Sequence, residues 1–259
     1  MYRAARMAAS GDAGEGEFSV FKTTLGALVE AASAPYRGAG RFPWHFARGK
    51  LSRDPIFTEI VARGLIPDGA RIVDLGCGLG LLASWLAAAQ TLWARALWPA
   101  TWPPPPRLES YHGIERVSRD AERARGIFGA SAITCGDIRT SPFGPASVVV
   151  IFDVLHYIDS AAQDDVLVRV RNALSPHGGL LLLRVGDAAA GWRFRVTLWV
   201  DRVITSIHGR HRQSLHCRPL EAWLARLRAL GFYVTPMPMS AGTPFANVLI
   251  VARLPAARA

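Results

Sequence analysis

The sequence predicts a doubly wound α/β fold in which a mostly parallel sheet of seven strands ends in an antiparallel hairpin. Two observations lead to this prediction. Short apolar runs alternate with amphipathic helical stretches from Arg71 to Leu230, which is typical of parallel strand–helix–strand units. The last two apolar runs, 232–239 and 247–254, are joined by a short loop around Gly242. Because that loop is too short to hold a crossover helix, the last two strands are expected to be antiparallel.

The composition supports one large domain and excludes several classes of protein. Its 259 residues, half of them apolar and 19% charged, are enough to build a sizeable core and exclude a disordered chain. Three widely spaced cysteines exclude a disulfide scaffold and favour a reducing compartment, so we expect a cytoplasmic protein. Residues 1–20 lack the apolar core of a signal peptide, and their glycines predict a flexible tail.

The alternating region supplies the individual elements in order. Residues 147–152 (SVVVIF) are continuously apolar, as expected for a strand that is buried on both faces. An uncharged run over 75–94 starts with a glycine-rich turn, which leaves a helix too short to cross a membrane. The other strands are predicted at 71–75, 110–114, 131–135 and 180–184, and helices at 81–94, 118–128, 164–174 and 219–230.

Two segments lie outside this alternation. Residues 21–66 precede the first strand and are predicted to form a helical cap on the domain that covers 67–259. Residues 92–106 hold three tryptophans and end in four prolines. Proline lacks the backbone N–H and fixes an extended backbone, so this segment is predicted to be an inserted loop.

The first strand runs into a glycine-rich loop, with the sequence VDLGCGLG over residues 73–80. Glycines directly after a strand let the backbone approach a ligand that faces the N–H groups of the next helix. The spacing G-x-G-x-G differs from the dinucleotide fingerprint G-x-G-x-x-G, which disfavours a nicotinamide dehydrogenase. Asp74 lies two residues before the first glycine, and a carboxylate at this place suits a cationic ligand better than a pyrophosphate.

This acidic loop resembles the hallmark of the class I S-adenosylmethionine-dependent methyltransferases, which have a Rossmann-like fold. The resemblance covers about residues 68–254, and further motifs follow in the family's order: GIER at 113–116, CGDI at 135–138 and DVLHY at 153–157. It implies S-adenosylmethionine as the cofactor and the following cofactor-binding residues: Asp74, Gly76, Cys77, Gly78, Gly80, Glu115, Arg116, Asp137, Ile138, Asp153 and Val154.

The resemblance also implies a role for three of these residues. Glu115 would accept hydrogen bonds from the ribose hydroxyls, Asp137 would meet the adenine amino group, and Ile138 would lie against the adenine ring. Asp74 and Glu115 are 41 residues apart, about twice the usual ~20 in such units. The inserted loop at 92–106 explains the excess.

Acidic residues lie at the carboxyl ends of four of the predicted parallel strands, namely Asp74, Glu115, Asp137 and Asp153. Ligands of open parallel sheets bind at the carboxyl ends of the strands, where these acids would meet a cationic sulfonium. Methyl transfer is an in-line displacement that needs alignment, and a base only where the acceptor loses a proton. His156, Tyr157 and His45 are the candidate catalytic residues. Whether His156 acts as a base or orients a loop stays open, and no metal is expected.

The net charge of +10 lies in two segments, 36–53 and 193–218, each of which carries +5. A basic amphipathic lid is predicted over 190–218. These arginines either cover the core and face solvent, or form a basic rim around an acceptor tunnel. Such a rim suits an acidic acyl carrier protein or an anionic lipid surface, and so permits peripheral membrane contact. Residues 36–55 also resemble methyltransferases of bacterial aryl polyene and related pigment pathways, whose acceptor is an aromatic head group carried as a thioester.

These observations predict a small-molecule methyltransferase of secondary metabolism with an aromatic or acyl acceptor, and leave O- and C-methylation open. Two alternatives are an RNA or protein methyltransferase that uses the basic surface, and a non-catalytic cofactor-binding partner subunit. Nucleic-acid bases are disfavoured because DVLH replaces the Asp/Asn-Pro-Pro-aromatic signature after the fourth strand. The spacing of His208, His211, His216 and Cys217 fits no zinc pattern. The sequence leaves the oligomeric state open.

Overall fold

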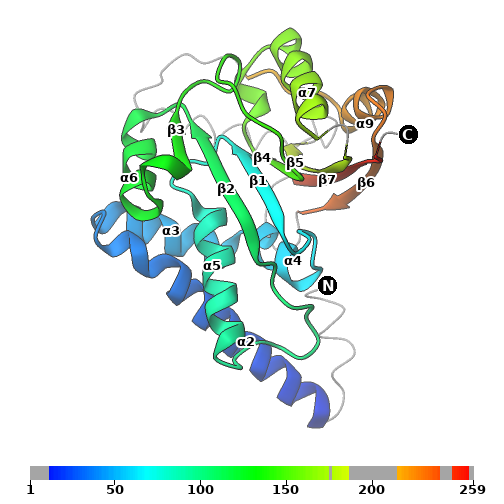
Figure 1. Cartoon of the computed structure of the whole chain (residues 1–259). Helices are drawn as coiled ribbons and strands as arrows, with labels where there is room; N and C mark the ends of the chain where they lie inside the picture. The colour runs from blue at the N-terminus through cyan, green and yellow to red at the C-terminus, as the bar shows by residue number, and fades with distance from the viewer. Residues whose placement is uncertain (1–11, 175–176, 187–214, 240–246, 257–259) are drawn as a thin grey trace. The chain divides into compact units, whose positions relative to one another are not determined.

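The computed structural model describes residues 12–174, 177–186, 215–239 and 247–256. These residues contain a seven-stranded sheet with the order β3-β2-β1-β4-β5-β7-β6 (Figure 1). Strands β1 and β4 pair in parallel, as do β4 and β5, whereas β7 is antiparallel to both β5 and β6. The predicted fold class is therefore confirmed. The strands are β1 Ala70–Leu75, β2 Leu108–Glu115, β3 Ile133–Cys135, β4 Val148–Phe152, β5 Gly179–Gly186, β6 Tyr233–Pro238 and β7 Asn247–Leu254.

The chain divides into two compact units. The first unit contains the described residues up to 70 together with 78–111 and 117–133. The second contains 71–77, 112–116 and the described residues from 134 onward.

The core of the second unit is built on the continuously apolar strand β4, of which residues 148–151 are fully buried. In register, Val149 lies between Val73 of β1 and Leu181 of β5. Helix α7 (Ser160–Leu174) packs against β4 and β5, and helix α9 (Leu220–Ala229) packs against β6 and β7 (Figure 1). Because both faces of β4 are covered, its lack of polar alternation is explained.

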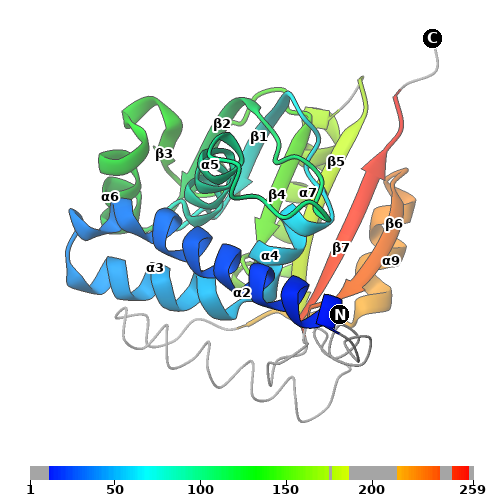
Figure 2. The ribbon, with the colours of Figure 1, turned by 90° about the horizontal axis from the view of Figure 1, so that it is seen from below.

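The first unit is helical. It contains α2 Asp12–Ser33, the 3-10 turn η1 Ala34–Arg37, α3 Arg41–Arg53, α4 Pro55–Ala62, α5 Leu81–Ala94 and α6 Ser118–Phe128. Helices α2 and α3 lie side by side (Figure 2), and α2 also packs against α5. The indole of Trp85 on α5 is fully buried and donates its N–H to the carbonyl of Phe57 at 2.8 Å. The helices predicted within 21–66 are therefore present.

One boundary prediction is wrong, because α2 begins at Asp12 and the predicted flexible tail over 1–20 is helical from that residue onward. Each glycine costs a helix about 1 kcal/mol relative to alanine. The same helix continues to Ser33 and packs against α3 and α5. Tertiary packing of this kind outweighs local propensity.

The inserted loop folds upon itself after α5 ends at Ala94. The Trp98 indole donates to the carbonyl of Pro103 at 2.9 Å. The rings of Trp98 and Trp102 meet edge to face, with centroids 5.3 Å apart. The predicted lid over 190–218 lies outside the described residues except for 215–218. Among the described helices, none is long and apolar enough to span a membrane.

Candidate cofactor site

Backbone hydrogen bonds join the carboxyl ends of neighbouring strands in the second unit. The N–H groups of Gly76 and Cys77, after β1, donate to the carbonyl of Ile114 on β2 at 2.7 and 3.1 Å. The N–H of Gly136, after β3, donates to the carbonyl of Glu115 at 2.9 Å. Since β1 and β4 are parallel neighbours, the acids in or just after the last residues of β1, β2, β3 and β4 lie at one edge of the sheet.

The thiol of Cys77 lies among the first of these acids. Burial raises the pKa of this thiol, and the negative charges of Asp74 and Glu115 raise it further. The thiol therefore stays protonated and is no nucleophile. Asp74 is itself only 5% exposed. The structure thus brings together three residues that the sequence predicted for one site.

Gly76 adopts a backbone conformation and a packing that only glycine permits. Its φ is +80°, and a Cβ there would lie 2.3 Å from Cγ2 of Val154. The residue after Asp153 therefore packs directly on the first glycine of the loop. Sequence analysis assigned both positions to the cofactor site, and the close contact shows why the loop has no side chain here.

The loop continues into Gly78 and Gly80, which belong to the first unit. Both have positive φ, of +57° and +76°. A Cβ at Gly80 would lie 2.5 Å from the ring of Phe128, whereas a Cβ at Gly78 would meet nothing within 4 Å. Gly80 is thus required by packing, while Gly78 borders open space.

Tyr36 supports the same loop within the first unit, and sequence analysis missed this role. Its side chain is fully buried, and its hydroxyl donates to the carbonyl of Leu79 at 3.0 Å. Tyr36 is 43 residues away from Leu79 in the sequence, so no local pattern could reveal the contact.

Replacing Tyr36 by Phe should lower the free energy of unfolding by about 1–2 kcal/mol, because the buried carbonyl of Leu79 loses its donor. Urea denaturation measures this change. Tyr233→Phe is the matched control, since Tyr233 is 73% exposed, and it should leave the stability unchanged. Equal effects of the two substitutions would contradict the role of Tyr36.

Asp137 lies at the predicted strand end, beside the buried Ile138, but its carboxylate is already engaged. Arg139 donates to it from Nε at 3.1 Å, from Nη2 at 2.7 Å and from its backbone N–H at 2.9 Å. These bonds from Arg139 hold the pKa of Asp137 below its usual value, and the charge of Arg116 lowers it further. Asp137 therefore stays ionised and fixed in place, ready to accept one more hydrogen bond.

Asp153, at the end of β4, pairs with an arginine that sequence analysis did not single out. Nε of Arg184 on β5 donates to Oδ1 of Asp153 at 2.9 Å, and Nη2 donates to Oδ2. The Arg184 side chain is only 2% exposed. Arginine within an otherwise apolar strand (LLLLRVG) is the sequence signal that could have revealed the pair, because buried charges require partners.

The candidate catalytic residues His156 and Tyr157 follow Asp153 on a short 3-10 turn, η3 Leu155–Tyr157. Their rings are in contact, with centroids 4.1 Å apart. The side-chain nitrogen Nε2 of the fully buried Gln163 lies 3.0, 3.0 and 2.7 Å from the carbonyl oxygens of Leu155, Ile158 and His216, which share its two hydrogens. The turn is thus held in place from α7, by a glutamine that the sequence did not reveal.

Burial lowers the pKa of His156, against the opposing charge of Asp153. Histidine in the unfolded chain has a pKa of about 6.5. Above that pH, His156 is neutral in both states, and its burial does not oppose folding. Stability is lost as the pH falls below 6.5, where the unfolded chain binds the proton first. We therefore expect His156→Gln to flatten the decline of unfolding free energy between pH 7.5 and 5.5. Phe46→Leu, a substitution of an exposed side chain that has no titratable group, is the control that should keep the wild-type slope. A wild-type slope in His156→Gln would contradict this account.

His45, the third candidate catalytic residue, lies exposed on α3 of the first unit, where its ring contacts Trp44 with centroids 4.5 Å apart. Its role in the site stays a prediction. Among the described residues, no group of three His, Cys, Asp or Glu side chains comes together as a metal site. His208 and His211 lie outside the described part of the chain.

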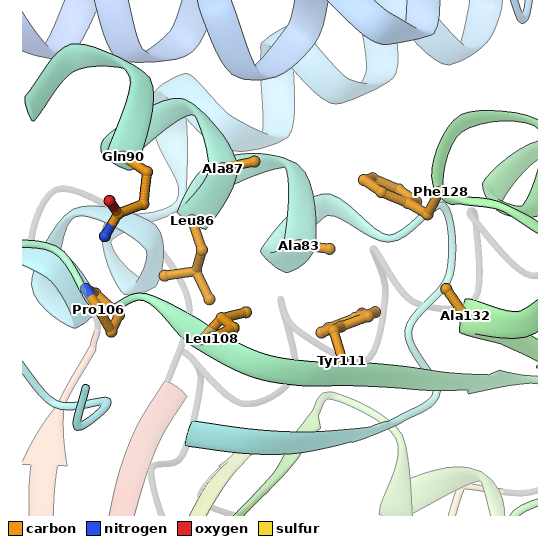
Figure 3. A pocket seen from close by; sticks show the side chains of 9 residues that line it. All are labelled: Ala83, Leu86, Ala87, Gln90, Pro106, Leu108, Tyr111, Phe128 and Ala132. Atoms are coloured by element: carbon orange, nitrogen blue, oxygen red, sulfur yellow. The ribbon is translucent and has the colours of Figure 1, made fainter. Parts of the chain in front are cut away.

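An apolar cavity of about 310 Å³ lies in the first unit, between α5, β2 and the end of α6 (Figure 3). It contains none of the residues that sequence analysis assigned to the cofactor. Its lining residues are Ala83, Leu86, Ala87, Gln90, Pro106, Leu108, Tyr111, Phe128 and Ala132.

Comparison with known proteins agrees with this geometry. A family model described as a methyltransferase domain matches residues 44–236. No curated protein matches the sequence. Among solved structures, a magnesium protoporphyrin IX methyltransferase from Synechocystis PCC 6803, with bound SAH, is similar at 15% identity and a TM-score of 0.51, over 83% of this chain and 88% of that one.

Two methyltransferases of antibiotic chemistry are also similar in structure. The mitomycin 7-O-methyltransferase has 25% identity and a TM-score of 0.50, over 80% of this chain and 56% of that one. An O-methyltransferase from neocarzinostatin biosynthesis, in complex with S-adenosylmethionine and 2-hydroxy-5-methyl naphthoic acid, has 20% identity and a TM-score of 0.51, over 81% and 55%. This chain therefore spans little more than half of those two proteins.

The match to the methyltransferase model extends over most of the sequence, and the strand order and the glycine-rich loop agree with it. The chain belongs to the methyltransferase-domain family and has the class I fold of S-adenosylmethionine-dependent methyltransferases.

Proposed function

We propose that this chain transfers the methyl group of S-adenosylmethionine to a small aromatic or acyl acceptor in secondary metabolism. The observation that carries the proposal is the set of backbone hydrogen bonds that gathers Asp74, Glu115 and Asp137 at one edge of the sheet, next to a glycine-rich loop. The similarity to the mitomycin 7-O-methyltransferase, at 25% identity, supports an acceptor of this kind.

The residues present at this edge fit the cofactor. The carboxylates at this edge, of which Asp74 is buried, suit a ligand with a positively charged sulfonium. Asp137 together with Ile138 offers a hydrogen-bond acceptor and an apolar surface of the kind that an adenine needs. At Gly78 a Cβ would meet no described atom within 4 Å, so the backbone of the loop is accessible there. When bound, S-adenosylmethionine supplies an activated methyl group, so that the protein has mainly to align the acceptor.

His156 is suited to take a proton from an acceptor hydroxyl. Burial lowers the pKa of His156, so the imidazole is neutral at pH 7 and can accept a proton. The Gln163 bonds fix the turn that carries His156, which limits the positions its ring can adopt. These residues therefore support O-methylation with His156 as the base. The sequence alone had left the choice between O- and C-methylation open.

The acceptor can be carried by an acidic protein, and α3 offers a surface for it. We call Arg41, Phe42, Phe46 and Arg53 the α3 face. The rings of Phe42 and Phe46 are 54% and 40% exposed and stack with centroids 6.2 Å apart. Within the described residues, Arg48 pairs with Glu30 and Lys50 pairs with Asp54, whereas no carboxylate pairs with Arg41 or Arg53. Arginines that pair with no carboxylate in the described part of the chain, and that lie beside exposed aromatic rings, suit an acidic acyl carrier protein.

Transfer of labelled methyl from S-adenosylmethionine to phenolic and acyl acceptors, free and attached to an acyl carrier protein, tests the proposal. We expect a methylated acceptor, and expect the carrier-bound form to lose efficiency as salt increases. Replacing Phe42 and Arg53 by Ala and Gln should raise KM for the carrier-bound acceptor only, whereas Tyr233→Ala should not. Labelled methyl on RNA or on protein side chains, and on none of the small acceptors, would overturn the proposal.

A further inference from the structure

Arg184 is the one buried arginine among the described residues, since the other buried polar residues are uncharged apart from Asp74. Its guanidinium forms a two-pronged pair with Asp153 and lies over the ring of Phe152, 5.7 Å from the centroid. Strand β5 therefore places a fixed positive charge beside the carboxyl end of β4. A charge so deeply buried is costly unless its partner stays in position.

Asp153 has a left-handed backbone conformation, which few residues other than glycine adopt, although aspartate does so more readily than most. Its φ is +57°, in the left-handed region, which residues other than glycine adopt at a cost. Arg184 holds this residue twice. Its guanidinium binds the carboxylate, and its carbonyl accepts the N–H of Asp153 at 3.3 Å. Such strain persists where the surrounding contacts fix it.

The conformation of Asp153 determines where the next residues lie. Val154 packs so closely on Gly76 that a Cβ there would overlap it at 2.3 Å. The turn over 155–157 then carries His156, whose carbonyl accepts the N–H of His216 at 2.8 Å. A change at Asp153 would therefore reach both the cofactor loop and the candidate base.

We propose that Arg184 is a positioning residue for methyl transfer, which fixes Asp153 in its left-handed conformation and thereby sets Val154 against the cofactor loop and His156 toward the acceptor. This inference rests on the proposed function and adds a residue that neither touches the reacting atoms nor belongs to the sequence motifs. Lysine cannot replace it, because a point charge does not bind both carboxylate oxygens as the planar fork does.

The test compares Arg184→Lys and Arg184→Met with the wild-type chain, and uses Arg171→Lys as the matched control. Arg171 lies in the same unit and donates to a backbone carbonyl, that of Leu230, at 3.0 Å. Calorimetry measures the Kd for S-adenosylmethionine, and steady-state kinetics measure kcat and KM for the acceptor. Thermal unfolding reports whether each variant is folded.

We expect Arg184→Lys to stay folded, and to lose on the order of 10-fold in cofactor affinity and roughly 100-fold in kcat, because small misplacements of aligned groups have effects of that size. Arg171→Lys should match the wild type. A variant Arg184→Lys with wild-type Kd, kcat and KM, and only a lower melting temperature, would overturn the inference, because Arg184 would then be merely structural.

Titration of the His156 ring by NMR provides a readout that does not depend on activity. Among the described residues, the charge of Asp153, which pairs with Arg184, acts on this ring, and the ring of Tyr157 lies against it with centroids 4.1 Å apart. The backbone N–H of His216 donates to the His156 carbonyl. Arg184→Met removes a positive charge that pairs with Asp153, so the pKa of His156 should rise relative to the wild type. An unchanged titration would contradict the inference. Failure of the wild-type chain to bind S-adenosylmethionine would instead overturn the proposed function. The His156 titration would still show whether the Arg184–Asp153 pair acts on this ring.

Discussion

Gly76→Ala is expected to abolish binding of S-adenosylmethionine and to lower the free energy of unfolding by roughly 3 kcal/mol. A methyl group at this position would overlap Cγ2 of Val154 at 2.3 Å, and the φ of +80° adds backbone strain. Left-handed conformation costs about 1–2 kcal/mol for residues with a Cβ, and overpacking costs a further 1–3 kcal/mol. Calorimetric titration and urea denaturation measure the two effects.

Gly126→Ala is the matched control for this substitution. Gly126 lies on α6, where a Cβ would meet nothing within 4 Å, so alanine should stabilise the helix by about 0.4–1 kcal/mol. The double variant Gly76→Ala with Val154→Ala separates the steric part from the strain, and should recover part of the lost stability. Wild-type cofactor affinity in Gly76→Ala would contradict the close packing described for this loop.

Gly78→Leu should weaken S-adenosylmethionine binding by roughly 100-fold or more, since the new side chain would fill space that the ligand needs. A Cβ at Gly78 would meet nothing within 4 Å, so the first side-chain atom of the new residue causes no clash among the described residues. Its φ of +57° still imposes strain of about 1–2 kcal/mol. Loss of affinity is therefore expected to exceed loss of stability.

Gly129 is the control for that experiment. It also has a positive φ, of +93°, with a ψ of 153°, and a Cβ there would likewise meet nothing within 4 Å. That region of φ and ψ is almost restricted to glycine, so Gly129→Leu should lose at least as much stability as Gly78→Leu while it keeps wild-type affinity. Equal affinity of the two leucine variants for S-adenosylmethionine would show that Gly78 does not border the cofactor.

Much of the fold follows from local patterns in the sequence. The helix over 81–94, the helix over 118–128 and the last strand over 247–254 agree with α5, α6 and β7 to the residue. Each has a clear signal: an uncharged run after a glycine turn, an amphipathic pattern, or a short loop that forces antiparallel pairing. The start of α2 at Asp12 could not be predicted in this way, because packing against α3 and α5 supports a segment whose glycines disfavour a helix.

The residues of the candidate site could be predicted where they are neighbours in the sequence or lie at the ends of adjacent parallel strands. Asp74, Gly76 and Cys77 are neighbours in one motif, and strand ends of a parallel sheet must meet at one edge. Arg184, Gln163 and Tyr36 were missed because each acts on a residue on another element. Arg184 reaches Asp153 across the sheet, Gln163 holds the turn at His156 from α7, and Tyr36 binds the carbonyl of Leu79. Such contacts depend on packing, which no local pattern records.

The central claim is that the edge of acids beside the glycine-rich loop binds S-adenosylmethionine. Calorimetric titration of the wild-type chain with S-adenosylmethionine, and separately with NAD, tests it most directly. The account predicts saturable binding of S-adenosylmethionine, lost in Gly78→Leu and kept in Gly129→Leu, and no binding of NAD. Tight binding of NAD without binding of S-adenosylmethionine would contradict it.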